Sequence, residues 1–96
     1  MASFFVVTTF DLKDASSADY DCAEKNLNAV GLSKTLKSGT VNLPYNTFAG
    51  QFTGKDAPSV RDFVRTKAKA ALNKCGLSGN LFVSVGGDWT WGSTTF

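Results

Sequence analysis

The chain of 96 residues is 43% hydrophobic and 19% charged, which is typical of one folded domain and excludes a disordered chain. It has no run of about 18 apolar residues, so the sequence offers no candidate membrane-spanning helix. The net charge of +2 is unevenly distributed: residues 1–30 carry five acids and two lysines, whereas residues 31–96 carry eight bases and three acids. This asymmetry permits an anionic partner without requiring one.

The first predicted element is a strand over residues 3–10, which are dense in Phe, Val and Thr. Apolar side chains alternate onto both of its faces, with Phe4, Val6 and Phe10 on one face and Phe5 and Val7 on the other. A strand with two apolar faces is typical of the centre of a sheet that is covered on both sides. The N-terminus lacks a basic leader, and an acid soon ends the apolar run, so we expect a cytoplasmic protein without a secretion signal.

Two helices are predicted by capping motifs and by apolar residues at helical spacing. Ser16 or Ser17 is expected to cap the first helix, and Ser16 with Asp19 fits a capping box. The second helix is expected to begin at a cap formed by Asp56 or Ser59 and to run to about Cys75.

The remaining pattern completes a strand and helix order of β-α-β-β-α-β. Residues 32–37 are expected to form an edge strand, residues 46–53 a third strand and residues 80–85 a fourth. Gly50, inside the third strand, indicates a bulge or a close approach of another backbone. This order predicts a single α+β domain, residues 1–96, of the ferredoxin-like plan, with a four-stranded antiparallel sheet and both helices on one face.

The second face of that sheet is then left open, and a partner subunit is its expected cover. Phe5 and Val7 are the candidate interface residues on the first strand. The tail, about residues 86–96, is expected to be an arm in which residues 88–94 form either a short fifth strand or an extended segment, so that Trp89 and Trp91 share a face and join the interface. Two alternatives remain open: the second apolar face is an effect of strand twist, or the tail is frayed.

Basic residues recur along the second predicted helix. Arg61, Arg65 and Lys69 are spaced i, i+4 and i+8, which places them on one flank, and Lys67 and Lys74 add charge nearby. An array of this kind suits a phosphate backbone, because each neutralised phosphate releases counterions. The alternative is an ordinary solvated helix face whose late lysines suit the helix dipole.

Residues for catalysis are few. The chain has no histidine, which excludes histidine-dependent acid–base catalysis. Asp11, at the end of the first strand, is a candidate ligand for Mg²⁺ or another divalent metal, and two copies across a two-fold axis could share one ion. The alternative is an Asp that caps a loop. Cys22 and Cys75 are too few for a disulfide framework or a metal site, and we expect two small buried thiols.

Several short motifs lie in the same order within residues 3–85, namely Phe10-Asp11, Asp19-Tyr20, Gly31-Leu32-Ser33-Lys34-Thr35 and Leu43-Pro44. In these the chain resembles small ferredoxin-like bacterial and phage proteins: CRISPR-associated nuclease-fold subunits, virulence-associated protein D and the endoribonuclease antitoxin GhoS. The resemblance implies a dimer built through the sheets and contact with nucleic acid. It also implies a metal-binding or catalytic role for Asp11, with Ser38 as the nearest candidate for an accompanying serine.

Together these features predict a small dimeric protein that binds RNA or DNA. Its two candidate roles are that of a metal-dependent endoribonuclease and that of an antitoxin. The alternative is a non-catalytic protein-binding module, encoded by a phage or plasmid, that inhibits a host defence system. The basic helix favours the first interpretation, and the incomplete catalytic set favours the second.

Overall fold

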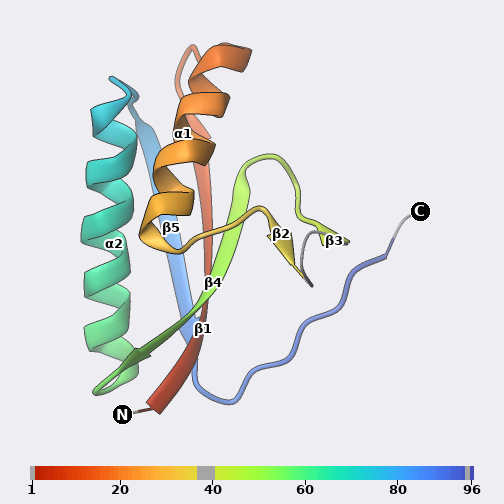
Figure 1. Ribbon diagram of the computed structural model, residues 1–96, viewed down its shortest axis with the longest axis vertical. Coiled ribbons are helices and arrows are strands. Elements are labelled where there is room, and N and C mark those ends of the chain that lie inside the picture. Colours follow the sequence, from red (N-terminus) through yellow and green to blue (C-terminus); the bar gives the residue numbers. More distant parts are fainter. Residues whose placement is uncertain (1, 37–40, 95) are drawn as a thin grey trace.

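The computed structural model describes residues 2–36, 41–94 and 96, and its fold is α+β (Figure 1). In chain order the elements are β1 (Ala2–Leu12), α1 (Ser17–Val30), β2 (Thr35–Leu36), β3 (Val41–Asn42), β4 (Thr47–Gly54), α2 (Ala57–Lys74) and β5 (Gly79–Gly86). β1 is the central strand of a three-stranded antiparallel sheet, between β4 and β5, while β2 and β3 form a separate two-stranded sheet. No helix in the described part of the chain is long and apolar enough to cross a membrane.

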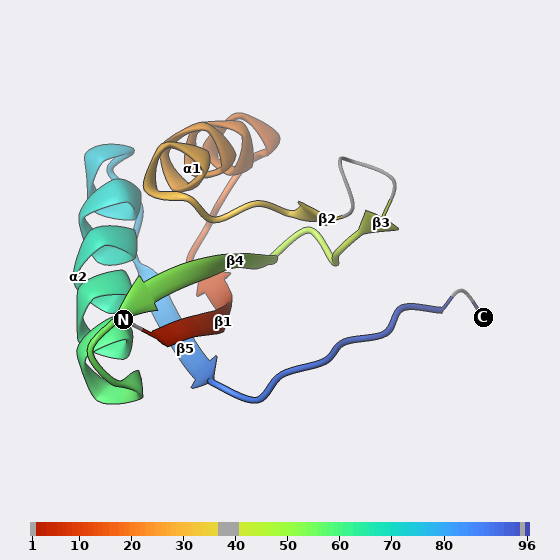
Figure 2. The same ribbon diagram turned by 60° about the horizontal axis from the view of Figure 1, so that its bottom comes forward.

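Both helices cover the same face of the three-stranded sheet (Figure 2). The face of β1 that they cover is buried at every second residue, at Phe4, Val6, Thr8 and Phe10. Thr8 is the polar member of this row, and its hydroxyl donates a hydrogen bond of 2.9 Å to the Phe48 carbonyl oxygen of β4. The helices contribute Ala23 and Leu27 from α1 and Val60, Val64, Ala68, Ala71 and Leu72 from α2. The opposite face of the sheet carries no helix, as the sequence predicted.

The helix boundaries follow the predicted caps. Ser16 and Asp19 form a capping box, in which each side chain accepts a hydrogen bond from the backbone N–H of the other residue. Asp56 caps α2, because its carboxylate accepts a 2.9 Å hydrogen bond from the backbone N–H of Ser59. Gly31 ends α1 at a φ of 108°, a left-handed conformation that favours glycine.

Gly50 in β4 lies directly against the end of α1. A Cβ atom added at residue 50 would collide with the carbonyl oxygen of Gly31. The close backbone approach expected at Gly50 is therefore confirmed, and it sets how near the first helix lies to the sheet.

The predicted edge strand at residues 32–37 is much shorter in the structure. Its link to β4 is a single antiparallel bridge between Ser33 and Ala49, and the strand that follows, Thr35–Leu36, pairs with β3 instead. The Ser33 hydroxyl accepts a 3.1 Å hydrogen bond from the Thr35 backbone N–H, which turns the chain away from β4. The main sheet therefore has three strands among the described residues, and not the four that the sequence predicted.

The tail is extended but forms no strand over residues 87–94. After β5 it leaves the three-stranded sheet on the side without helices and runs toward the β2–β3 pair (Figures 1 and 2). Of the two expected forms, a short fifth strand and an extended arm, the described residues of the tail take the second. Trp89 instead stacks on Phe5 of β1, with ring centroids 4.8 Å apart. The tail thus packs on its own sheet through a side chain.

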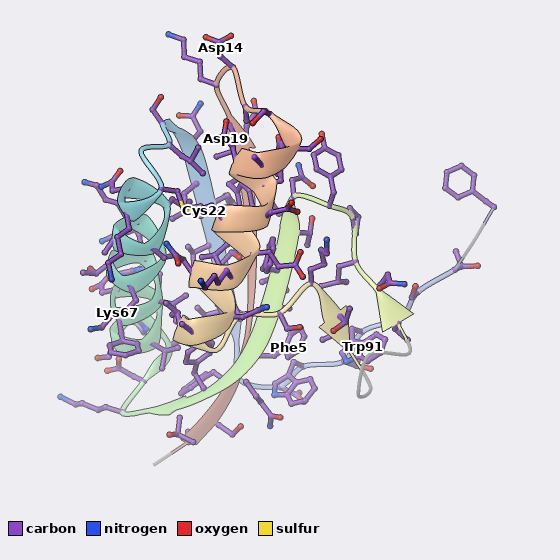
Figure 3. All side chains as sticks on the ribbon, turned by 45° about the horizontal axis from the view of Figure 1, so that its top comes forward. Phe5, Asp14, Asp19, Cys22, Lys67 and Trp91 are labelled. Atoms are coloured by element: carbon purple, nitrogen blue, oxygen red, sulfur yellow. A yellow bond between two sulfur atoms is a disulfide. The ribbon has the colours of Figure 1, made fainter. Side chains whose placement is uncertain are left out.

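Cys22 and Cys75 form a disulfide, and this corrects the expectation of two buried thiols. Cys22 lies on α1, and Cys75 is the C-cap of α2 (Figure 3). The two helices pack side by side and run in opposite directions, so the first turns of α1 lie near the end of α2 (Figure 1). Asn26 strengthens the same contact, because its side-chain amide donates a 3.0 Å hydrogen bond to the Ala71 carbonyl oxygen.

Candidate nucleic-acid interface

The rotation of α2 is fixed by its buried stripe, and this decides where the basic side chains point. Each of three basic residues directly follows a buried residue in the sequence and is itself exposed. These basic residues are Arg61 after Val60, Arg65 after Val64, and Lys69 after Ala68. They therefore share one exposed side of the helix, which we call the outer flank, as their spacing predicted.

The outer flank contains one acid, Asp62. Its Oδ1 atom lies 3.0 Å from the Arg61 Nε atom and 3.2 Å from the Arg65 Nη2 atom. The hydrogen bond from Arg61 lowers the pKa of Asp62, so this carboxylate is charged at neutral pH. Exposed pairs of this kind contribute little to stability, but they hold two guanidinium groups side by side. No ion pair involves Lys69 within the described ranges.

Arg65 and Lys69 also border an open hollow of about 370 Å³ between α2, β5 and the end of β1. Its walls are four leucines, Leu12, Leu72, Leu77 and Leu81, and its polar residues include Asn73, Ser78 and Asn80. We call this hollow the leucine groove. Two cations thus lie at the edge of an apolar depression, a feature that helical spacing alone did not indicate.

Lys67 and Lys74 do not belong to the outer flank. They line a different hollow, on the side of α2 that meets α1, together with Phe63 and Asn26. The Lys67 ammonium group lies 5.8 Å from the centroid of the Phe63 ring, within the range of a cation–π interaction. The structure therefore divides the five predicted basic residues between two surfaces.

The neighbouring helix has the opposite charge. α1 carries three acids, Asp19, Asp21 and Glu24, and one base, Lys25. Glu24 makes a 3.0 Å ion pair with Lys34, and the other two acids have no ion pair among the described residues. A polyanion on the helical layer would be attracted by α2 and repelled by α1, which favours the outer flank over the side that meets α1.

Asp11 is exposed near the end of β1, where it pairs in register with Asn80 of β5. A divalent cation such as Mg²⁺ requires several oxygen ligands. In the described ranges 2–36, 41–94 and 96, no three Asp, Glu, Cys or His side chains come together as a metal site. Ser38, the other predicted catalytic residue, lies outside the described residues. Asp11 therefore belongs to no cluster of three such side chains in these ranges.

The open face of the sheet carries the predicted interface residues. Phe5 and Val7 are half-buried there, and Trp89 covers Phe5 but remains 37% exposed. Trp91 is half-buried beside Val41 of β3 (Figure 3).

Phe82 of β5 was not among the predicted interface residues, yet it lies on the same open face opposite Thr9 and is 64% exposed. Its position could have been read from the sequence, because the alternating Leu81, Val83 and Val85 face the core. Phe82 therefore extends the apolar surface across β5.

Comparison of the chain with protein-family models, with curated proteins and with solved structures gave no match. Two surfaces of the molecule are therefore its candidate functional sites. These are the outer flank with its leucine groove, and the open apolar face of the sheet.

Proposed function

We propose that this protein binds nucleic acid, and that the outer flank of α2 contacts the phosphate backbone. The observation that carries the proposal is the exposed row of Arg61, Arg65 and Lys69, fixed by the buried stripe of the same helix. Successive turns of a helix are about 5.4 Å apart, so the row presents cations at a regular spacing along a line. Each phosphate neutralised there releases counterions, which supplies sequence-independent affinity.

The charge of the rest of the helical layer supports this assignment. The acids of α1 oppose a polyanion that would lie across both helices. They leave the outer flank, on the far side of α2, as the favoured path for a phosphate backbone. Asp62 reduces the charge of this flank, but it also orders the two arginines beside it.

The ferredoxin-like plan remains part of the proposal. What supports it is a central β1 between β4 and β5, with both helices on one face of the sheet. Endoribonuclease activity stays a prediction that depends on Asp11 and a divalent metal. Binding by the outer flank requires neither.

We further propose that the open face of the sheet joins a second copy of the chain. Support comes from an apolar surface that includes Phe5, Val7, Phe82 and Trp89, two of which are more than one-third exposed. A two-fold contact would place this surface against itself and would remove exposed aromatic area from both copies. The outer flanks would then lie on the outside of the dimer, because they are on the helical side of each sheet.

A gel-shift experiment at low salt with labelled single-stranded and duplex oligonucleotides tests the binding proposal. The double variant Arg65→Glu/Lys69→Glu reverses two charges of the outer flank and is expected to abolish the shift. Lys67→Glu/Lys74→Glu is its matched control, with the same change of net charge on the other side of the same helix. This control is expected to retain most of the binding.

Equal loss of binding in the two double variants would mean that total charge, and not the outer flank, determines affinity. A wild-type protein that gives no shift at low salt overturns the proposal. The alternative of a protein-binding module then becomes the one to pursue, by pull-down from a nuclease-treated bacterial lysate.

A further inference from the structure

The leucine groove has the composition of a site for the base of a nucleotide. Its walls are aliphatic, and its polar lining includes Asn73 and Ser78, an amide and a hydroxyl that can donate and accept hydrogen bonds at a base edge. Its volume of about 370 Å³ falls within the range of about 300–1,000 Å³ that is common for small-ligand sites. The two cations at its edge, Arg65 and Lys69, would meet the phosphates on either side of that base.

We propose that the leucine groove takes one unstacked base of a single strand whose phosphates run along the outer flank. This inference rests on the proposed function and adds a substrate class to it. In a duplex the bases are paired and stacked inside the helix, so none could enter the groove without being extruded. A single strand can turn out a base at little cost, so the protein prefers single strands to duplexes.

The hollow between the helices is the competing site, and it is less suitable. It also has two cations, Lys67 and Lys74, and it is lined by Phe63. However, its amide side chain, Asn26, already donates hydrogen bonds to the Ala71 carbonyl oxygen and to the Cys75 Sγ atom. It also adjoins the acidic helix, whereas the leucine groove continues directly from the outer flank.

The decisive comparison uses two probes with the same phosphates. One is a fluorescein-labelled oligothymidylate, and the other is an abasic deoxyribose-phosphate strand of the same length. Fluorescence anisotropy should give a dissociation constant that is lower by about ten-fold for oligothymidylate than for the abasic strand, since burying part of one base against the leucine side chains contributes about that much. The abasic strand should still bind, through phosphates alone, and should lose that binding in Arg65→Glu/Lys69→Glu.

A variant that narrows the groove provides the second test. Ser78 is exposed and lines the groove, so Ser78→Leu adds an uncharged side chain that has no ring to stack on a base. It should raise the dissociation constant for oligothymidylate toward that of the abasic strand and leave the abasic value unchanged. Thr66→Leu, at an exposed position of α2, is the matched control and should change neither value.

The outcomes separate the two proposals. If both probes bind wild type equally and lose binding in Arg65→Glu/Lys69→Glu, the base site is wrong while the proposed function stands. If Ser78→Leu, folded by circular dichroism, keeps the full preference for oligothymidylate, the site is not in this groove. If neither probe binds wild type at low salt, both proposals fail.

Discussion

Cys22 and Cys75 form a covalent link between the two helices, with Cα atoms 6.0 Å apart and a sequence separation of 53 residues. The link closes a loop that contains most of α1, β2, β3, β4 and α2. A small domain gains from such a crosslink, because it restricts the unfolded chain more than the folded one. The disulfide therefore stabilises the domain whose second helix carries the outer flank.

The double variant Cys22→Ser/Cys75→Ser should be less stable than wild type. For a loop of this length the chain-entropy model gives a loss of about 4 kcal/mol in the free energy of unfolding. Urea denaturation followed by circular dichroism measures this loss. Dithiothreitol should lower the urea midpoint of wild type and leave the variant unchanged. Equal midpoints for the oxidised wild type and the variant would show that the disulfide contributes nothing.

The stack of Trp89 on Phe5 predicts that the tail is held to the sheet. Trp89→Ala should lower the free energy of unfolding by about 1 kcal/mol, as expected for the loss of one aromatic pair. It should also remove the part of the tryptophan emission that iodide quenches more strongly, because Trp89 is the more exposed of the two tryptophans. Thr90→Ala is the control at the neighbouring exposed position and should do neither. An unchanged stability in Trp89→Ala would mean that the tail is not anchored.

The dimer proposal predicts different results for two exposed phenylalanines on opposite faces. Wild type should have twice the chain mass of 10.2 kDa in light scattering at micromolar concentration. Phe82→Glu places a charge on the open face and should give a monomer. Phe63→Glu changes a ring on α2 and should leave the dimer intact. The two rings are similarly exposed, since Phe63 is 52% exposed and Phe82 is 64% exposed. A monomeric wild type would contradict the proposal.

The cap of α2 predicts a dependence of stability on pH. The pKa of Asp56 lies below its ordinary value of 3.8, because the side chain and the backbone N–H of Ser59 both hydrogen-bond to the charged carboxylate. The stabilisation is therefore complete above the pKa of the unfolded chain and is lost as pH falls through the lower folded pKa. Asp56→Asn keeps an acceptor that does not titrate. Thermal melts should show wild type losing stability relative to this variant only in the acid range. A constant difference between the two proteins from neutral to acid pH would contradict the assignment.

Local sequence signals predicted the parts of the fold that depend on neighbouring residues. Ser16 and Asp56 were readable as caps because a cap needs only side chains within three or four positions. The two-faced pattern of β1 predicted a central strand, and Gly50 predicted a close approach of another backbone. In each case the chemistry lies in one short segment.

Other features depend on how distant segments pack, and the sequence did not show them. The disulfide requires the start of α1 to meet the end of α2, which no spacing of two cysteines indicates. The edge strand is short because Thr35 and Leu36 pair with β3 and not with β4, which the alternation of residues 32–37 does not indicate. In the candidate site, the helical period grouped Arg61, Arg65 and Lys69 correctly. It could not show that the last two border the leucine groove, because that groove is completed by β5 and Leu12.

The salt dependence of binding tests the central claim most directly. The dissociation constant of a labelled single strand is measured by anisotropy between about 50 and 200 mM salt for wild type, Arg65→Glu/Lys69→Glu and Lys67→Glu/Lys74→Glu. Three phosphate contacts on the outer flank predict that the logarithm of the association constant falls with the logarithm of salt concentration at a slope of about −2. The outer-flank variant should show no measurable binding over this range, and the control should keep a slope near the wild-type value. A wild-type slope that the outer-flank variant retains, or that both variants lose equally, would contradict the account.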